Sequence, residues 1–173
     1  MIYLSLGSNI EPRKIYLIEA LKLIKKKIGE IKLKSSISET KSWGYNDNDY
    51  LNMVVEIKTK YSPFELLKLT QSIEKQLGRI NKSDKEIDGT IHYSARVIDI
   101  DILFYENQII NTKQLIIPHP LLHTRRFVLV PLNDIAYEFK HPIMDKSIQE
   151  LLKDCKDKSK IKEYYSIEIE TTN

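Results

Sequence analysis

Residues 96–103, RVIDIDIL, constrain the fold most strongly, because they form a strand pattern that carries acids where apolar residues are expected. Side chains at positions i and i+2 of a strand share a face, so the isoleucines point one way while Asp99 and Asp101 point the other. The Cβ atoms of the two acids then lie about 6.5 Å apart, twice the rise per residue. Two carboxylates at this spacing are costly to keep charged without a neighbouring cation. The pattern therefore predicts a site for hard divalent cations that share phosphate oxygens as ligands.

A purely structural interpretation of the same segment is an edge strand whose acidic face is solvated. The isoleucines on either side of each acid favour a central strand instead, and Arg96 adds a cation three residues before the first acid. We therefore expect residues 96–103 to form a central strand of a sheet, with both carboxylates at a functional site.

The composition limits the class of protein. A chain of 173 residues with 42% hydrophobic and 29% charged residues is expected to form one domain, residues 1–173, with a sizeable core. The net charge of +3 permits anionic ligands without requiring nucleic acid. Cys155 is the only cysteine, which excludes an intramolecular disulfide and a thiolate metal cage and favours a packing role. No signal peptide precedes the first strand and no apolar run approaches a membrane span, so we expect a cytoplasmic protein that does not bind membrane. Nothing in the sequence resembles a dimer seam, so we expect a monomer, and we expect no nucleic-acid partner.

Hydrophobic periodicity predicts four strands, over residues 2–8, 31–41, 50–60 and 96–103. Start and stop signals predict two helices, one from Pro12 to Gly29 and one from Ser62 to Gly78. Residues 79–95 are polar and lack periodicity, which predicts a long loop that is functional or disordered. Residues 108–117 are expected to form a small hairpin, and the chain from Pro120 onward short helices. Residues 161–173 fit either a short edge strand or a disordered tail.

The predicted order is β-α-β-β-α-β followed by a C-terminal extension, which is an α+β fold. This order is that of the ferredoxin-like fold, with an antiparallel sheet. The core is expected to span about residues 1–135, with a helical C-terminal extension over 136–173. Because this fold hosts enzymes, metal carriers and RNA-binding modules, the function has to be inferred from particular side chains.

Two side chains at the start of the third predicted strand suit a flat ligand. Tyr50 and Asn52 share a face, which places an aromatic ring beside an amide that offers both a donor and an acceptor. An amide can read the edge of a heterocycle while a ring stacks on its surface. The structural alternative is a surface tyrosine next to a turn asparagine.

A second group of candidate residues follows the acidic strand. His119 lies between two prolines, and the residue before a proline avoids helical angles, so His119 is expected in an extended segment. Arg125, Arg126 and Phe127 follow, and paired arginines suit phosphate. The structural alternatives are a hydrogen-bonded loop histidine and solvated charges.

The second predicted helix carries a further polar pair. Gln71 and Glu74 stand at positions i and i+3, on a face that we expect to lie away from the apolar stripe. Arg79 directly follows Gly78 and is placed to reach from the helix end into a site. The glycine at Gly7, after the first strand, is a weak signal because it fits an ordinary turn. No Walker, Rossmann or zinc-ligand pattern is present in the sequence.

Together these motifs make the sequence similar to the 6-hydroxymethyl-7,8-dihydropterin pyrophosphokinase family of folate biosynthesis. The acidic strand and the His-Pro to Arg-Phe block are the specific parts of the resemblance, whereas the glycine turn is not. The matching segments occur in family order, over residues 6–9, 49–52, 71–79, 96–103, 118–120 and 125–129.

The resemblance implies an ATP-dependent diphosphotransferase, 2-amino-4-hydroxy-6-hydroxymethyldihydropteridine diphosphokinase, which transfers pyrophosphate from ATP to the pterin and releases AMP. It implies that Asp99 and Asp101 hold two Mg²⁺ ions on the triphosphate, and that Arg96 and Arg79 assist catalysis. It assigns the pterin site to Gly7, Thr40, Trp43, Tyr50, Asn52 and Phe127. It assigns the nucleotide site to Gln71, Glu74, Arg96, Ile102, His119 and Arg125.

The segment before the acidic strand departs from the family pattern, which has further basic residues and often a tryptophan there. By alignment, Tyr93 replaces the aromatic residue, His92 replaces a common arginine, and Asn81 stands where some members have arginine. We hypothesise that Lys82 or Lys85 contacts phosphate and that this loop is a mobile lid, because phosphoryl transfer needs water excluded.

Two other functions fit parts of the sequence. A ferredoxin-like RNA-binding module requires solvent-facing aromatic residues on central strands, but aspartates stand at the critical positions here and repel RNA. Another magnesium-dependent nucleotide enzyme, such as a nucleotidyl transferase, fits the acidic pair alone, although Tyr50, Asn52 and Phe127 favour a flat heterocycle. Formation of AMP and a pterin diphosphate, rather than ADP or free pyrophosphate, distinguishes these functions.

Overall fold

The computed structural model describes residues 1–41, 49–78, 85–87, 90–92 and 97–164. The strands are β1 (Ile2–Ser8), β2 (Gly29–Lys34), β3 (Ile37–Thr40), β4 (Tyr50–Thr59), β5 (Lys85–Ile87), β6 (Thr90–His92), β7 (Asp99–Tyr105), β8 (Ile110–Asn111), β9 (Ile116–Ile117) and β10 (Ile161–Tyr164). The helices are α1 (Arg13–Lys27), α2 (Pro63–Gln76), α3 (Arg126–Ala136) and α4 (Ile148–Asp154), with a short 3-10 helix at Leu122–Thr124.

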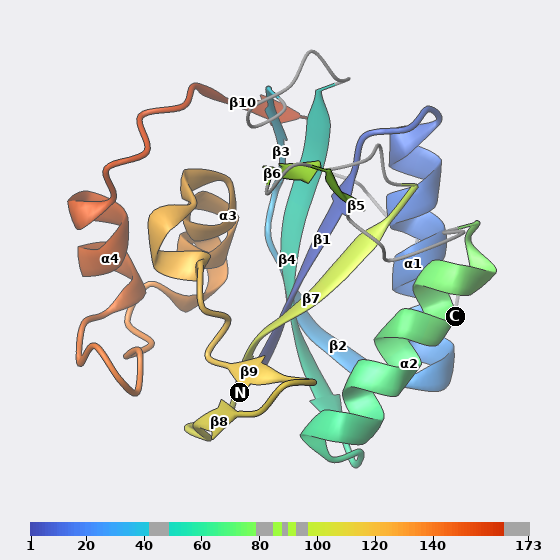
Figure 1. The fold of residues 1–173 in the computed structure, drawn as a ribbon, viewed down its shortest axis with the longest axis horizontal. Coiled ribbons are helices and arrows are strands. Elements are labelled where there is room, and N and C mark those ends of the chain that lie inside the picture. The colour runs from blue at the N-terminus through green and yellow to red at the C-terminus, as the bar shows by residue number, and fades with distance from the viewer. Residues whose placement is uncertain (42–48, 79–84, 88–89, 93–96, 165–173) are drawn as a thin grey trace.

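One antiparallel sheet organises the molecule (Figure 1). Its strand order is β10-β3-β4-β1-β7, and β2 pairs with a further part of β4. The ten-residue β4 is long enough to pair with β3 at its beginning and with β2 at its end. Along the chain, the elements up to the acidic strand follow the order β1, α1, β2, β3, β4, α2, β5, β6 and β7, which is a mixed α and β arrangement around an antiparallel sheet.

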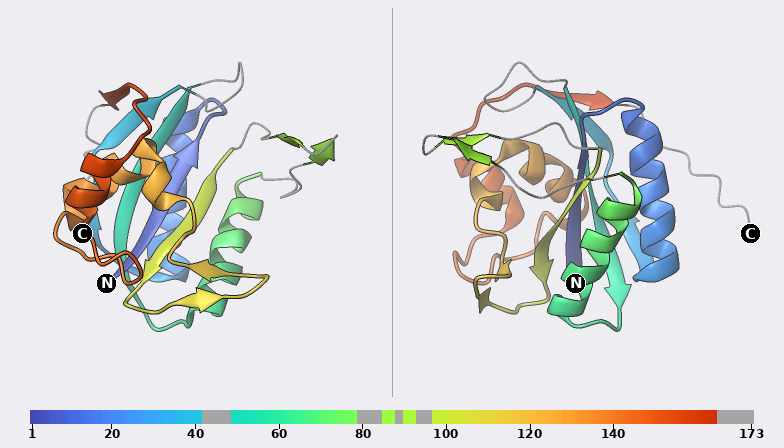
Figure 2. Two further views of the ribbon diagram at one scale, coloured as in Figure 1. Left: turned by 60° about the vertical axis from the view of Figure 1, so that its left-hand side comes forward. Right: turned by 45° about the vertical axis from the view of Figure 1, so that its right-hand side comes forward.

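Helices cover both faces of this sheet (Figure 2). Helices α1 and α2 pack on one face, where a first core includes Leu17, Leu66 and the β1 residues Ile2, Leu4 and Leu6. Helix α3 packs on the other face and α4 packs against α3, and a second core there includes Tyr3, Leu129 and the buried Cys155. Because side chains alternate along a strand, β1 and β4 each contribute to both cores.

Both predicted helices form, and their ends match the expected signals. In α2, the backbone N–H of the N-cap Ser62 donates to Glu65 Oε2 at 2.8 Å as part of a capping box. Gly78, just beyond this helix, has a φ of +104°, a conformation that side-chain-bearing residues rarely adopt. The predicted hairpin in residues 108–117 also forms, as β8 and β9.

The single strand predicted over residues 31–41 is wrong, because this segment forms the two strands β2 and β3. The break lies at Ser35, whose hydroxyl accepts the Val54 N–H at 2.9 Å in place of a backbone carbonyl. The Ser35 N–H still donates to the Val54 carbonyl at 2.9 Å. A side chain that replaces one ladder bond interrupts the strand without separating it from β4.

The central position predicted for the acidic strand is also wrong. Among the described strands, β7 pairs only with β1 and ends the sheet. Its isoleucines are nevertheless buried, because α2 packs over that side of the edge. At the opposite edge, residues 161–164 form β10, so this part of the C-terminal segment is an edge strand, and residues 165–173 lie outside the described part.

The segment predicted as one long loop contains a short hairpin. Strands β5 and β6 pair with each other and stand apart from the main sheet (Figure 2). Lys85 and His92 are register partners in this hairpin, whereas Asn81, Lys82 and Tyr93 lie outside the described residues. The expected lid and its phosphate contact stay predictions.

Candidate active site

One cross-strand row brings together the predicted site residues Asn52, Gly7 and Asp99, which are successive register partners across β4, β1 and β7. Ser38 of β3, which was not predicted, extends the row beyond Asn52. By strand alternation, they lie on the face of the sheet that α3 covers. Adjacent strands are about 4.8 Å apart, so Asn52 and Asp99 stand about 10 Å apart on either side of Gly7.

Gly7 keeps the middle of this row open. A Cβ atom at this position would lie 3.2 Å from Asn52 Oδ1 and 3.9 Å from Tyr50 Cδ1. Tyr50 and Asn52 therefore border the same space, as their shared face predicted. Gly7 was a weak signal in the sequence, but in the structure any side chain at this position would press on the Asn52 amide.

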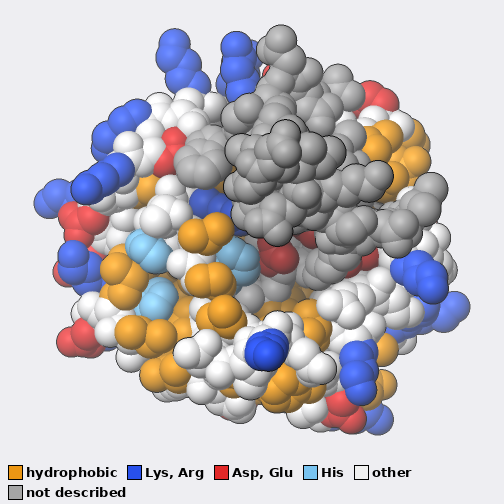
Figure 3. All heavy atoms as spheres, in the orientation of Figure 1, with side chains coloured by type: hydrophobic (Ala, Val, Ile, Leu, Met, Phe, Trp, Pro, Cys, Tyr) orange, Lys and Arg blue, Asp and Glu red, His pale blue; other side chains and the backbone are white. Residues whose placement is uncertain are grey.

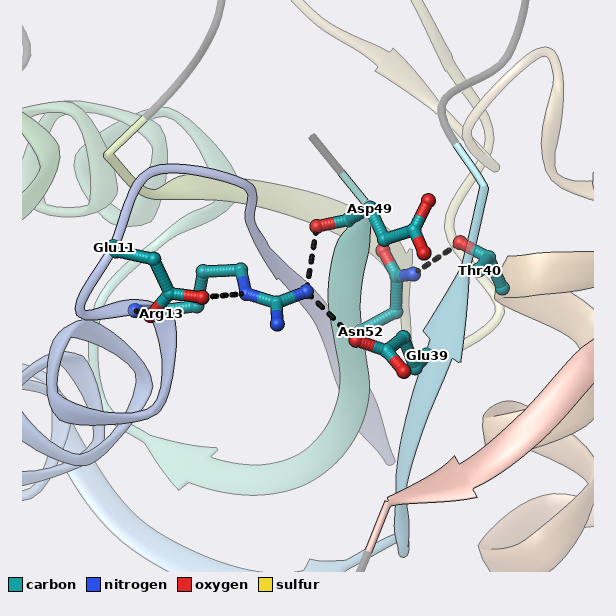
Figure 4. Close-up of polar contacts among 6 residues, drawn as sticks. All are labelled: Glu11, Arg13, Glu39, Thr40, Asp49 and Asn52. Carbon is teal, nitrogen blue, oxygen red and sulfur yellow. Dashed lines mark hydrogen bonds and ion pairs between the residues drawn. The ribbon is translucent and has the colours of Figure 1, made fainter. Parts of the chain in front are cut away.

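The Asn52 amide is buried and held by a hydrogen bond. Asn52 and Thr40 are 3% and 4% exposed, and Asn52 Nδ2 donates to Thr40 Oγ1 at 2.9 Å. This bond spans β4 and β3 (Figure 4). It orients the amide so that Oδ1 faces the space above Gly7, which gives a fixed polar group for the edge of a flat ring.

The two acids of β7 lie half-buried beside this space. Asp99 is the register partner of Gly7, and Asp101 is the partner of Ser5, so both carboxylates share the face predicted for them. In the face view of Figure 3, acidic side chains lie next to a histidine near the centre. Carboxylate oxygens on a single face are hard donors of the kind that magnesium takes.

A β-bulge in β7 connects the acidic strand to His119. Tyr3 pairs with Phe104 and Leu4 with Ile102, so Leu103 is an extra residue in the register. The Leu103 carbonyl accepts the His119 N–H at 2.9 Å. The edge of the acidic strand thereby anchors the Pro-His-Pro segment.

His119 is held in a neutral form by its surroundings. Burial, and then the neighbouring Arg125 guanidinium, lower the pKa of His119 to about 4, although Asp99 acts in the opposite direction. Its Nδ1 accepts the Leu121 N–H at 3.2 Å, so the neutral ring carries its proton on Nε2. His119, Asp99 and Arg125 thus lie within electrostatic reach of one another, as the site prediction requires.

Phe127 lies beside Arg125 at the start of α3. The Arg125 guanidinium stands over the Phe127 ring at 5.7 Å from its centroid, a cation–π distance. The ring also packs against the second core while remaining partly exposed. The 119–127 segment therefore presents a neutral imidazole, a cation and an aromatic ring on the side of the acids.

Glu74 occupies a different position from the one expected. It is only 2% exposed and belongs to the buried side of α2, so the prediction that it faces away from the apolar stripe is wrong. Its Oε1 accepts the Ile100 N–H at 2.8 Å. Ile100 lies between Asp99 and Asp101, so Glu74 holds the edge strand at the residue between the two acids.

Two of the remaining predicted residues, Gln71 and Ile102, are described and are not brought into this group. Gln71 is exposed on α2, and the Ile102 side chain lies in the first core, on the other face from the acids. Trp43, Arg79 and Arg96 lie outside the described residues.

Arg13 is a site neighbour that the sequence prediction missed. Its guanidinium contacts Glu39 at the end of β3 and the Asp49 carbonyl just before β4 (Figure 4). The sequence contains a signal for this role, because a cation in the first turn of a helix is disfavoured by the helix dipole. Its presence there indicates a compensating contact elsewhere.

No cluster of three or more histidine, cysteine, aspartate or glutamate side chains in the described part of the chain is arranged to hold a metal ion. Likewise, none of the described helices has the length and apolar character needed to cross a membrane.

The chain is similar to known proteins over most of its length. Residues 3–137 match the family described as 7,8-dihydro-6-hydroxymethylpterin-pyrophosphokinase (HPPK). The Bacillus subtilis 2-amino-4-hydroxy-6-hydroxymethyldihydropteridine pyrophosphokinase is 41% identical over 165 residues, which cover 94% of each chain. The Aquifex aeolicus protein of the same name is 37% identical over 150 residues, 86% of this chain and 88% of its own.

Solved structures show a similar fold. A Plasmodium falciparum HPPK-DHPS crystal structure matches with a TM-score of 0.72 and 20% identity. The match covers 88% of this chain and 45% of the solved chain, so this chain spans less than half of that protein. At this identity the likeness concerns the fold alone.

Proposed function

The chain belongs to the 7,8-dihydro-6-hydroxymethylpterin-pyrophosphokinase family, and from this premise we propose how its site works. The enzyme transfers pyrophosphate from ATP to 6-hydroxymethyl-7,8-dihydropterin, which gives AMP and the pterin diphosphate in folate biosynthesis. The observation that carries the assignment of its residues is the row in which Asn52 and Asp99 flank a glycine.

The pterin is proposed to bind on the Asn52 side of this row. The amide of Asn52, held by Thr40, hydrogen-bonds the edge of the ring, and the open space above Gly7 admits the ring itself. Tyr50 borders that space and offers an aromatic face. Phe127 is proposed to pack on the opposite face of the pterin, where its ring is exposed beside Arg125.

The triphosphate is proposed to bind on the Asp99 side. Asp99 and Asp101 fit two Mg²⁺ ions, because their carboxylates share one face of β7. Glu74 holds the backbone N–H of Ile100, the residue between them, in place. When bound, magnesium neutralises charge on the phosphate oxygens. His119 offers a neutral Nε2–H donor, and Arg125 supplies a permanent cation for the same oxygens.

Catalysis on this arrangement comes from positioning and electrostatics. The transition state of phosphoryl transfer carries its charge mainly on the phosphate oxygens, so fixed donors and cations stabilise it without covalent chemistry. The row places the pterin and the triphosphate at neighbouring strands, which brings the hydroxymethyl oxygen toward the β-phosphate for an in-line displacement that releases AMP.

We also make proposals about the domain organisation, oligomeric state and location of the protein. We propose one domain over residues 1–173, with a ferredoxin-like core over about 1–135, and the order β7-β1-β4 with β2 and β3 beyond supports this core. The monomeric state and the cytoplasmic location stay predictions, as do the roles of Arg79, Arg96 and Trp43.

Product analysis tests the function. The purified chain is incubated with ATP, Mg²⁺ and 6-hydroxymethyl-7,8-dihydropterin, and the nucleotides are separated by anion exchange. We expect AMP and the pterin diphosphate in equal amounts, and no AMP when the pterin is left out. Release of ADP or of free pyrophosphate would contradict the assignment.

A further inference from the structure

Arg13 lies at the start of α1 and contacts both strands that carry the proposed pterin site (Figure 4). Its Nη1 donates to Glu39 Oε1 at 2.9 Å and to the Asp49 carbonyl oxygen at 2.8 Å. Its Nε donates to Glu11 Oε1 at 2.6 Å. One guanidinium therefore joins the beginning of α1 to the end of β3 and to the residue before β4.

These contacts end next to residues of the pterin site. Glu39 precedes Thr40, Asp49 precedes Tyr50, and Thr40 and Tyr50 are register partners at the end of the β3–β4 ladder. Because successive side chains of a strand face opposite ways, Glu39 points to the side of α1 and away from the substrate face. Arg13 thus contacts the two strands from behind the site.

The contact of Arg13 with Glu39 differs from an ordinary surface ion pair. The two side chains are 15% and 22% exposed, whereas those of the Lys22–Glu19 pair, on the same helix, are 63% and 44% exposed. A guanidinium also donates from a rigid planar fork, so its hydrogen bonds fix the direction of their acceptors. Partial burial and fixed geometry make this contact suited to holding two strands in register.

We propose that Arg13 is a positioning residue for the pterin, which sets the spacing of the β3 and β4 ends so that Asn52 keeps its orientation. The inference rests on the pterin site proposed above. The Asn52–Thr40 hydrogen bond of 2.9 Å spans the same two strands, so a change in their separation alters the amide. The triphosphate side is built on β7 and on the 119–125 segment, which Arg13 does not join in the described contacts, so ATP binding is largely independent of it.

Steady-state kinetics of matched variants test the inference. Arg13→Ala and Glu39→Ala are each expected to raise the KM for the pterin about tenfold, which corresponds to about 1.4 kcal/mol, and to change the KM for ATP less than about twofold. The double variant is expected to match Arg13→Ala, because removing Glu39 has no further effect on a contact that the loss of Arg13 has already broken. Lys22→Ala, in the exposed pair of the same helix, is the control and is expected to leave both KM values unchanged.

Asn52→Ala separates failure of this inference from failure of the site. If Asn52→Ala raises the KM for the pterin and Arg13→Ala does not, the inference is overturned while the site stands. If Arg13→Ala raises both KM values equally and lowers the urea midpoint, Arg13 has only a general structural role and the inference is again overturned. If Asn52→Ala has no effect, the pterin site and the inference fail together.

Discussion

Replacing Glu74 should weaken the edge strand that carries both acids. Glu74 is 2% exposed and its carboxylate accepts the Ile100 N–H at 2.8 Å, so Glu74→Ala leaves a buried N–H without this acceptor. An unsatisfied buried donor costs about 1–3 kcal/mol. We therefore expect a destabilisation of about 2 kcal/mol, the middle of this range. In a domain of this size, that corresponds to a fall of roughly 4–8 °C in Tm.

Urea unfolding measures the expected loss of stability, and magnesium titrations of activity measure the expected effect on the acidic pair. Glu74→Gln keeps an acceptor oxygen and the shape of the side chain, so it is expected to stay within about 1 kcal/mol of wild type. Gln71→Ala, at an exposed position of the same helix, is the control for helix effects. Because Ile100 lies between Asp99 and Asp101, Glu74→Ala should also raise the magnesium concentration needed for half-maximal activity. A Glu74→Ala midpoint equal to that of Gln71→Ala would refute the reasoning.

Three further outcomes follow from the same geometry. Gly7→Ala places a Cβ 3.2 Å from Asn52 Oδ1, so the KM for the pterin should rise while the unfolding midpoint changes little; an unchanged KM would count against the row. The pKa of His119 is lowered to about 4, so the unfolded chain binds more protons between about pH 4 and 6.5, and unfolding free energy should fall on acidification through that window. His119→Asn should flatten this part of the pH profile in urea titrations, and an unaltered slope would contradict the assignment. The buried Ser8 hydroxyl has no hydrogen-bond partner among the described residues, so Ser8→Ala should leave the urea midpoint unchanged or raise it, whereas a clear drop would show that the hydroxyl is satisfied.

The alternation of side chains along strands, and the residues that start and stop helices, predicted the parts of the fold that depend on neighbours in the chain. The shared face of Asp99 and Asp101, and that of Tyr50 and Asn52, follow from the period of a strand and are present in the structure. The caps of α2 follow from Ser62 and the glycine after its end. These features need only neighbours in the chain, which the sequence supplies directly.

The errors concern partners that are distant in the chain. Glu74 looks solvent-facing beside Gln71, but its acceptor role is set by a strand that lies 26 residues later. The bulge at Leu103 leaves no trace in the pattern, because residues 102–105 are all apolar and a change of register does not alter their polarity. The edge position of β7 was missed because α2 buries its isoleucines as fully as flanking strands would. The isoleucines thus predicted correctly which face of the strand is buried, but they did not predict which strands pair with it.

The acidic pair on β7 is the centre of the proposed mechanism, and its removal is the most direct test. Pterin-dependent AMP formation is measured with saturating ATP over a range of magnesium concentrations, for wild type and for Asp99→Asn and Asp101→Asn. Both variants keep the shape of the side chain and should unfold near the wild-type midpoint. We expect each to lose at least about a hundredfold in rate, the scale on which removal of a transition-state electrostatic contact acts. Wild-type rates in either folded variant would contradict the assignment of that carboxylate to the magnesium site.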